Sequence, residues 1–274
     1  MLAESAKPGA VLLRPFSAAA YFLRKTANIF EMEMRKLRHE PIDLLTRAIQ
    51  PLLWLLIFGQ VLAGVRAIPT GDFGYIEFMA PGILAQSVLF ISIFYGLSII
   101  WERDLGIIHK FLASPTPRAS LVLGKGLSAG VRGLSQAAII YPLALILDVN
   151  VNLEPLHLLG VFATVLMGAV LFATLSLFIA IKVKTRERFM GIGQVITMPL
   201  FFASNAIYPI AIMPGWLQTI SHFNPLTYVV DALRTFMLAG GVSAFGLGQD
   251  FAILILVSAV LVWLASRAYP SFVI

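Results

Sequence analysis

Residues 189–230 read FMGIGQVITMPLFFASNAIYPIAIMPGWLQTISHFNPLTYVV, a stretch of 42 residues without a formally charged side chain. A membrane-spanning helix needs about 20 apolar residues to cross roughly 30 Å of hydrocarbon, so this stretch is too long for one helix. Two full helices would leave almost no residues for a turn, and the stretch also contains Pro199, Pro209, Pro214, Gly215 and Pro225. We therefore predict a spanning helix over residues 189–207 and then a broken, re-entrant helical hairpin over residues 208–236. Non-helical backbone at membrane depth must be covered by protein, so we expect this hairpin to pack against the other spans.

The composition of the whole chain indicates an all-α polytopic membrane protein. Of its 274 residues, 59% are hydrophobic and only 12% are charged, and the mean hydropathy is +0.88. A soluble domain of this size does not need so much apolar surface. Five further stretches are long and apolar enough to span a bilayer, and with residues 189–207 they make six transmembrane helices: 44–65, 79–101, 119–147, 156–181 and 251–267.

The sequence lacks the motifs of common catalytic and metal sites. It contains no cysteine, which excludes disulfide bonds, thiolate nucleophiles and cysteine-based metal sites. The nearest match to a Walker A motif, Gly124-Lys125, has Ala119 in place of the first glycine and Gly126 in place of serine or threonine. No HExxH or GxSxG motif is present, and the four histidines lie in four different segments. We therefore expect no catalytic residue, no metal site and no enzymatic activity of the chain itself.

The N-terminal part divides into a tail and an amphipathic helix. Residues 1–20 contain no convincing secretory signal, and we expect them to be a mobile tail. Residues 21–40 carry apolar side chains at alternating spacings of four and three, which is a helical face, and the basic residues lie mainly on the other sides. The apolar face consists of Leu23, Ala27, Phe30, Met34 and Leu37. This pattern predicts an interfacial helix that lies on anionic lipid. We expect this helix and the spans that follow it, residues 21–274, to form a single transmembrane domain.

The distribution of basic residues predicts the orientation in the membrane. With the N-terminus in the cytoplasm and six crossings, 18 of the 20 Lys and Arg residues lie on the cytoplasmic side, and only Arg66 and Arg234 lie outside. Excess Lys and Arg collect on that side of membrane proteins, so the net charge of +6 does not require a nucleic-acid partner. Two full spans within residues 189–230 would instead place Arg267 outside. We therefore predict an inner-membrane protein with both termini in the cytoplasm.

A charged segment between the second and third spans, residues 102–125, reads ERDLGIIHKFLASPTPRASLVLGK. As a helix over residues 102–114 it would carry an apolar face of Trp101, Leu105, Ile108 and Leu112, and Pro115 and Pro117 would end it. An apolar helical face outside the membrane is expected to bind a partner that covers it. The periodicity alone does not distinguish between the lipid headgroups of the bilayer and another protein as that partner.

The third predicted span is longer than the bilayer requires. Its 29 residues would extend about 43 Å as a helix, so its first turns are expected to stand outside the hydrocarbon. Arg118, Lys125 and Arg132 are spaced by seven and share one face. We favour snorkelling of these side chains to lipid phosphates over a basic stripe that faces a cavity or an acidic partner.

The hairpin over residues 208–236 has the composition of a gate at the outer membrane surface. Its prolines break the helix, and its aromatic rings suit the membrane interface. Asp231 and Arg234 are three residues apart on one helical face, so we expect them to pair. The residues predicted for this extracytoplasmic gate are Pro209, Asn224, Pro225, Tyr228, Asp231 and Arg234. The alternative is a plain outer loop whose charged side chains are solvated.

Two segments resemble the membrane subunits of ABC transporters of the type-2 permease family, which includes daunorubicin-resistance-type exporters. The more specific one runs from Phe223 to Arg234 and is similar to the signature that leads into the last span. The other is similar to the family's cytoplasmic coupling helix and contains Glu102-Arg103, Gly106, Phe111-Leu112 and Pro115. The order of elements also agrees with the family, so the resemblance covers essentially the whole chain.

The resemblance implies a permease that uses a separate ATPase. Two ATPase subunits and a second permease chain, as a homodimer, would complete the transporter, and ATP and Mg²⁺ would bind to the ATPase, leaving this chain without a cofactor. The segment after span two would dock into a cleft of the ATPase with the interfacial helix beside it. The coupling residues implied are Glu102, Arg103, Leu105, Gly106, Ile108, Phe111, Leu112 and Pro115.

The expected function is therefore export of an amphipathic or hydrophobic compound, drug-like or lipid-like, from the cytoplasm or inner leaflet. Exporters of glycans or lipid-linked saccharides share the architecture and remain an alternative. A secondary transporter or channel would require buried ionisable residues or inverted repeats, and an intramembrane enzyme would require a nucleophile–base pair or metal ligands. The sequence shows none of these features.

Overall fold

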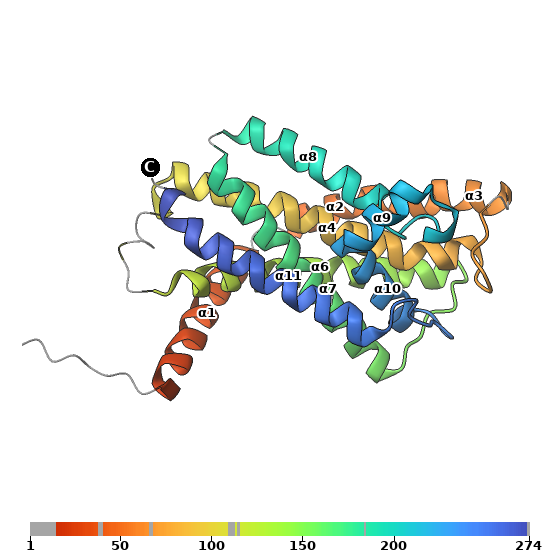
Figure 1. Cartoon of the computed structure of the whole chain (residues 1–274), viewed down its shortest axis with the longest axis horizontal. Helices are drawn as coiled ribbons and strands as arrows, with labels where there is room; N and C mark the ends of the chain where they lie inside the picture. Colours follow the sequence, from red (N-terminus) through yellow and green to blue (C-terminus); the bar gives the residue numbers. More distant parts are fainter. Residues whose placement is uncertain are drawn as a thin grey trace, which may run out of the picture.

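The computed structural model describes residues 15–37, 41–65, 68–108, 113, 116–183 and 185–272. These residues fold into a bundle of helices, as predicted, and the long helices run side by side along one axis (Figure 1). Four of the predicted spans are single long helices: α4 (Tyr75–Asp104), α6 (Arg118–Ile146), α7 (Pro155–Lys182) and α11 (Leu247–Ala268). Helices α4 and α7 form the centre of the bundle, because both pack against α6 and α10 and α7 also packs against α11.

The first predicted span is a run of three helical pieces. It comprises α2 (Pro41–Leu53), the π-helical segment η1 (Trp54–Gly59) and α3 (Gln60–Val65). Pro51 lies inside α2 and has no N–H to donate to the preceding turn, and the widened π-helical turn begins three residues later. Among the described residues, this run and the four long helices are the five segments long and apolar enough to cross a membrane. The chain is therefore a multi-pass membrane protein.

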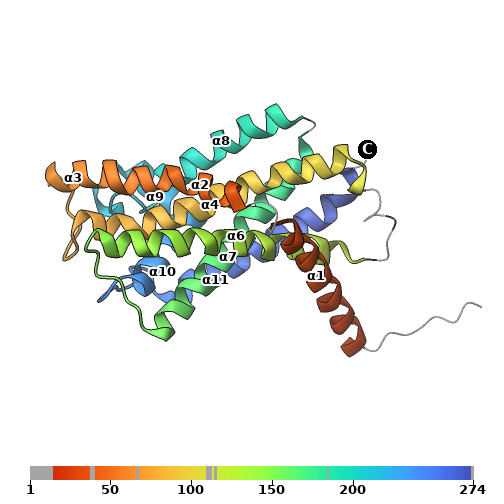
Figure 2. The same ribbon diagram turned by 180° about the vertical axis from the view of Figure 1, so that it is seen from behind.

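The remaining predicted span corresponds to α8 (Arg186–Phe202). Its 17 residues extend about 25 Å, which is short of the hydrocarbon thickness, so a sixth crossing is not confirmed. The helix ends five residues before the predicted boundary at 207, because the amide of Asn224 donates to the carbonyl oxygens of Leu200 and Ala203 and caps its last turn. Figures 1 and 2 show α8 at the edge of the bundle. Its buried side chains recur every fourth residue and form a single stripe: Phe189, Gly193, Thr197 and Phe201.

Three short helices stand where the hairpin was predicted. They are η2 (Ile210–Ile212), α9 (Gly215–Phe223) and α10 (Pro225–Met237), at the end of the bundle opposite the chain's C-terminus (Figure 1). We call this the hairpin end. Neither α9, at about 13 Å, nor α10, at about 20 Å, is long enough to cross a bilayer. The prediction that this segment does not span is consistent with their lengths, whereas its re-entrant depth stays a prediction.

Helix α1 (Pro15–Leu37) projects from the other end of the bundle at a steep angle to the long helices (Figures 1 and 2). We call this the α1 end. The helix begins at Pro15, a residue suited to a first helical turn, so the predicted tail over residues 1–20 is wrong for its last six residues. It packs on α6 at Gly124, where a Cβ atom would lie only 2.7 Å from the Cβ of Ile29. A larger residue at this position would push the two helices apart.

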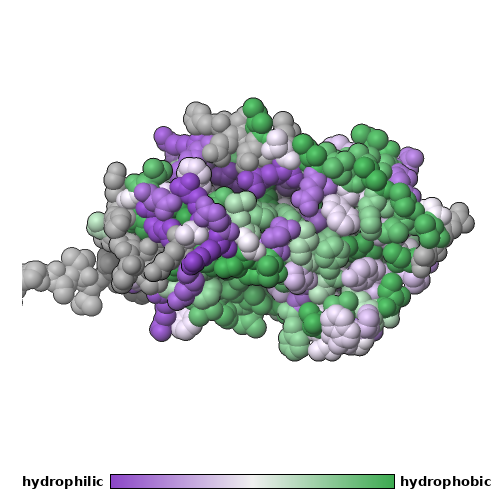
Figure 3. All heavy atoms as spheres, turned by 90° about the horizontal axis from the view of Figure 1, so that it is seen from above, coloured by the Kyte–Doolittle hydropathy of each residue, from purple (hydrophilic) through white to green (hydrophobic). Residues whose placement is uncertain are grey.

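The face of α1 that packs into the protein is not the predicted apolar face. The buried side chains are Thr26, Ile29 and Glu33, whereas Leu23 is exposed and the other large members of the predicted face are half-buried: Phe30, Met34 and Leu37. The apolar face therefore lies beside the packed one and is available to lipid. Hydrophilic residues gather toward the α1 end of the molecule, and hydrophobic surface covers much of the rest of this view (Figure 3).

Candidate functional site

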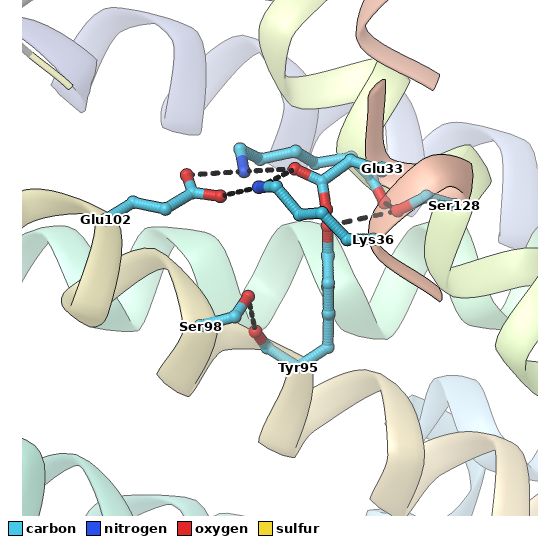
Figure 4. A network of polar contacts seen from close by, with 7 residues as sticks. Glu33, Lys36, Tyr95, Ser98, Glu102 and Ser128 are labelled. Atoms are coloured by element: carbon cyan, nitrogen blue, oxygen red, sulfur yellow. Dashed lines mark hydrogen bonds and ion pairs between the residues drawn. The ribbon is translucent and has the colours of Figure 1, made fainter. Parts of the chain in front are cut away.

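Four charged side chains from three helices meet at the α1 end and form what we call the four-charge ring (Figure 4). Lys125 of α6 lies between two carboxylates, with its Nζ 2.9 Å from Glu33 Oε1 and 2.7 Å from Glu102 Oε2. Lys36 closes the ring, since its Nζ lies 2.6 Å from Glu102 Oε1 and 3.1 Å from Glu33 Oε1. The ring thereby joins α1, α4 and α6, and its formal charges sum to zero.

The four-charge ring is mostly buried. The side chains of Lys125 and Glu33 are each only 1% exposed, so neither reaches water or a lipid headgroup. Burial alone would raise the pKa of Glu33, but the nearby Lys125 and Lys36 outweigh this and lower the pKa to about 2. The carboxyl group is therefore ionised at neutral pH. The predicted snorkelling of Lys125 is wrong, because its ammonium group turns inward to two acidic residues of its own chain.

The other members of the predicted basic stripe have different surroundings. Arg132 is buried, with its guanidinium carbon 4.9 Å from the ring centroid of Tyr95, whereas Arg118 is exposed. The hydroxyl of Ser128 donates to the Tyr95 hydroxyl at 3.0 Å, directly below the four-charge ring (Figure 4). Two of the three residues of the stripe therefore point into the protein, toward Glu33, Glu102 and Tyr95 of the chain itself, and neither the expected snorkelling nor the alternative of a cavity or acidic partner describes them.

The opposite side of the end of α4 is held by the connection between α7 and α8. Arg103 Nη1 donates to the carbonyl oxygen of Val183 at 3.1 Å, and Arg186 Nη2 donates to Asp104 Oδ2 at 3.0 Å. The guanidinium of Arg186 also stacks over Trp101, 3.6 Å from the ring centroid. We call these contacts the Arg186 arm. Both members of its ion pair are partly exposed, at 36% for Arg186 and 38% for Asp104.

The turn that follows α4 exposes one of the predicted coupling residues and buries another. Gly106 adopts a φ of +70°, a left-handed conformation that ends a helix and that glycine adopts without steric cost. Leu105 before it is 70% exposed, whereas Ile108 after it is fully buried and packs with side chains of α4, α6 and α7. The prediction that these residues share one face of a helix over 102–114 is therefore wrong. Phe111, Leu112 and Pro115 lie outside the described residues.

A cavity of about 280 Å³ lies between α2, α4 and α8. Its lining combines amides, hydroxyls and aromatic rings: Thr46, Arg47, Gln50, Pro51, Gln86, Ser87, Phe90, Ile91, Phe94 and Gln194. The side chain of Gln86 is buried, and its Oε1 has no hydrogen-bond partner within the part of the chain that the structure describes. Buried polar atoms are normally paired, so this oxygen is an exception among the residues around the cavity.

The predicted gate residues build the hairpin end. Asn224 caps α10 by accepting from the N–H of Leu226 at 3.0 Å, and Pro225 occupies the first turn of that helix. The hydroxyl of Tyr228 donates to the carbonyl oxygen of His222 at 2.6 Å and so ties α10 back to α9. Pro209 precedes η2. These contacts fold the hairpin onto itself and onto the end of α8.

Asp231 and Arg234 do not form the predicted pair, because each bonds elsewhere. Asp231 accepts from the hydroxyl of Ser243 at 2.7 Å and from the N–H groups of Ala244 and Phe245, so it caps the loop that leads into α11. Arg234 donates to the carbonyl oxygens of Phe78 and Asn205, at 3.2 and 2.9 Å. Three residues on a helix are close enough to pair, but carbonyl oxygens from two other segments lie closer to the guanidinium.

Sequence reasoning missed Glu33, Lys36 and Arg186 as site residues. A signal for two of them was present, because Thr26, Ile29, Glu33 and Lys36 recur at helical spacings of three and four. The amphipathic pattern of this helix instead assigned its basic residues to anionic lipid. Arg186 had no comparable signal, since its contacts with the end of α4 depend on the path of the chain between α7 and α8.

Comparison with known proteins places the matched region over α1 to α10. Residues 27–238 match the family model described as ABC-2 type transporter. The chain is 29% identical over 217 residues to the putative transport permease ycf38 of Cyanophora paradoxa, covering 78% of this chain and 74% of the relative. It is 26% identical over 204 residues to the daunorubicin resistance ABC transporter permease protein DrrB1 of Streptomyces coeruleorubidus, covering 74% and 71%. It is 25% identical over 209 residues to the inner membrane transport permease YadH of Escherichia coli K12, covering 74% and 77%.

Proposed function

The chain belongs to the ABC-2 type transporter family, and from this we propose that it is the membrane-spanning subunit of an ATP-driven exporter. A separate ABC ATPase supplies the energy and carries the ATP and Mg²⁺. Two ATPase subunits and a second copy of this permease complete the transporter in the cell membrane. The α1 end faces the cytoplasm, in agreement with the concentration of Lys and Arg there, and both termini are cytoplasmic. Helix α8 provides the sixth crossing, and the re-entrant hairpin forms the outer gate.

The observation that carries this proposal is the exposed apolar turn at the end of α4. Leu105 projects from the α1 end, and the half-exposed ring of Trp101 lies one turn before it. Contacts on both sides fix this turn, through Glu102 toward α1 and through Asp104 toward Arg186. An exposed apolar side chain that is held in place at an aqueous surface is suited to bind in a hydrophobic cleft of a partner protein. The Arg186 arm lies beside it and widens the surface that the ATPase would contact.

The cavity between α2, α4 and α8 is the proposed path of the substrate. Phe90 and Phe94 provide apolar rings, and Gln50, Gln86 and Gln194 provide amides that donate and accept hydrogen bonds. Small-molecule sites typically combine mostly apolar walls with a few polar groups. This lining favours an amphipathic compound with hydroxyl or amide groups over a purely hydrocarbon one. The π-helical turn of η1 lies just beyond the α2 part of this wall, where a local change in helix winding would alter its shape.

A docking experiment tests the proposed function. We expect Leu105→Asp to weaken co-purification of the ABC ATPase, because losing the buried leucine contact removes about 2 kcal/mol, or roughly 30-fold in affinity. The matched control is Val242→Asp, a similarly exposed apolar side chain at the hairpin end, which should leave co-purification unchanged. Equal ATPase binding by both variants and the unmodified chain would refute docking at this turn.

Transport is measured with the permease and its ATPase in proteoliposomes. Amphipathic drug-like compounds should stimulate ATP hydrolysis and accumulate on the side of the membrane opposite the ATPase. Stimulation by lipid-linked saccharides alone would support the alternative substrate class. Transport without any ATPase subunit, driven by an ion gradient, would contradict the proposed function as a whole.

A further inference from the structure

Two consecutive residues at the end of α4 face opposite sides of the bundle. Glu102 bonds to Lys36 of α1 and Lys125 of α6, whereas Arg103 bonds to the carbonyl oxygen of Val183. Side chains turn by about 100° per residue along a helix, and here this step directs Glu102 to α1 and α6 and Arg103 to the end of α7. The end of α4, with the exposed turn at Leu105 directly after it, is therefore held from two directions.

The four-charge ring and the Arg186 arm differ in how easily their contacts with α4 break. In the four-charge ring, Lys125 and Glu33 are almost fully buried, and withdrawing Glu102 would leave buried charges without their counter-ions. Removing a partner from a buried ion pair is strongly unfavourable. The ion pair of the Arg186 arm is more than one-third exposed on both sides, and exposed pairs contribute little because water replaces them readily. A force on the turn would therefore break the Arg186 arm before it breaks the ring.

We propose that the four-charge ring makes α1, α4 and α6 one rigid unit at the α1 end. When the ATPase moves the exposed turn at Leu105, the contacts of the Arg186 arm separate and those of the ring stay formed. Glu102, Lys125, Glu33 and Lys36 are then positioning residues for coupling and do not themselves contact the ATPase. This inference rests on the proposed function. Beyond the proposed function, it states that the ion pairs of the ring persist during the transport cycle and that the ion pair between Arg186 and Asp104 breaks.

The geometry connects this release to the substrate path. Arg186 is the first residue of α8, and Gln194 two turns later lines the cavity together with α2 and α4. The packing of α8 on the bundle is confined to one stripe of buried residues, and Phe189 is the member of this stripe in its first turn. Separation of Arg186 from Trp101 and Asp104 would let α8 move away from α4 and change the width of the cavity between them.

A matched pair of charge-neutralising variants tests the proposal in the reconstituted complex. Glu102→Gln changes a member of the ring, and Glu31→Gln makes the same chemical change at an exposed carboxylate of α1 outside the ring. We expect Glu102→Gln to lower the amount of substrate moved per ATP hydrolysed at least about fivefold, while the ATPase still binds. Glu31→Gln should stay within about twofold of the unmodified protein, because its carboxylate is exposed. Normal coupling in Glu102→Gln would overturn the proposal.

A second variant separates coupling from folding. Glu102→Gln leaves an excess positive charge in the ring, and adding Lys36→Gln restores neutrality around the remaining Glu33–Lys125 pair. We expect this double variant to recover thermal stability while its coupling ratio stays low, because the charged link from α4 is still missing. Recovery of both properties together would mean that the ring is only structural.

Spin-label distances give a readout that does not depend on any ring variant. The chain contains no cysteine, so cysteines can be placed at the exposed positions Arg35, Arg118 and Glu187, with labelled chains diluted into unlabelled ones. Between the nucleotide-free and vanadate-trapped complex, the distance between labels at 35 and 118 should stay constant, and that between labels at 35 and 187 should change. A change within the first pair would overturn the proposal. A complex that fails to hydrolyse ATP at all would count against the proposed function instead.

Discussion

Replacing Lys125 by methionine removes the central charge of the four-charge ring and keeps an unbranched side chain of similar length. The ammonium group lies 2.9 Å from Glu33 and 2.7 Å from Glu102, and Lys36 would have to balance both carboxylates alone. Removing one partner of a buried ion pair costs about 3–5 kcal/mol, because the remaining charge is left uncompensated. In a chain of this size, the loss corresponds to a fall in melting temperature of roughly 10 °C.

Thermal unfolding of the purified permease in detergent, followed by tryptophan fluorescence, measures this effect. Lys182→Met is the control, because that lysine is exposed in the last turn of α7, and its replacement should change stability by less than about 0.5 kcal/mol. Adding Glu33→Gln to Lys125→Met should recover part of the loss, since one unbalanced carboxylate is then removed. The reasoning is refuted if Lys125→Met melts within about 2 °C of the unmodified protein.

Two further predictions concern pH and the cavity. The pKa of Glu33 is lowered from an ordinary value of 4.5 to about 2, so its ionised form stabilises the fold above pH 4.5, and this contribution is lost as the pH falls toward 2. The melting temperature of Glu33→Gln should therefore depend less on pH in this window than that of the control Glu31→Gln, whose carboxylate is exposed; equal dependence would contradict the assignment. Gln194→Trp places an indole in the cavity between α2, α4 and α8, and we expect it to weaken substrate-stimulated ATP hydrolysis roughly 10-fold by crowding the site. Val195→Trp, on the neighbouring exposed face outside the cavity lining, should have little effect, and equal loss in both variants would count against the proposed substrate path.

The long helices were predictable because membrane spans depend on local information. The helix boundaries of α7 and α11 differ from the predicted spans by at most four residues, since a run of about 20 apolar residues has few alternatives to a spanning helix. The end of α8 was not predictable in the same way. Residues 203–207 carry no charge or proline that would mark the end of the helix, and the helix stops where Asn224, more than twenty residues later, caps its last carbonyl groups. Such a boundary depends on tertiary contacts that periodicity does not record.

Only part of the candidate site was predicted, because the side-chain contacts of the site also depend on segments that are distant in sequence. Leu105 and Gly106 lie in a turn where the sequence predicted a helix over residues 102–114. The positive φ of Gly106 redirects the chain and buries Ile108, which a helical wheel places beside Leu105. Asp231 and Arg234 were paired on spacing alone, and each found closer partners on other segments. Residue spacing therefore predicts which side chains lie on the same face of a helix, but it does not predict which other segments of the chain that face will contact.

The four-charge ring illustrates why the sequence assigned Lys125 to lipid phosphates and not to buried carboxylates. Glu33 and Glu102 lie 92 and 23 residues from Lys125 in sequence, so no local window contains the three charges together. Taken singly, each charge favours an exposed position, because an unpaired charge is rarely buried. Only when α1, α4 and α6 meet do the charges balance and burial become favourable. The contacts of Glu102 and Arg103 show the same dependence: the two residues are adjacent on one helix, yet Glu102 bonds to α1 and α6 whereas Arg103 bonds to the carbonyl oxygen of Val183. Both residues therefore hold the end of α4 in place, and only the assembled helices show which neighbour each of them binds.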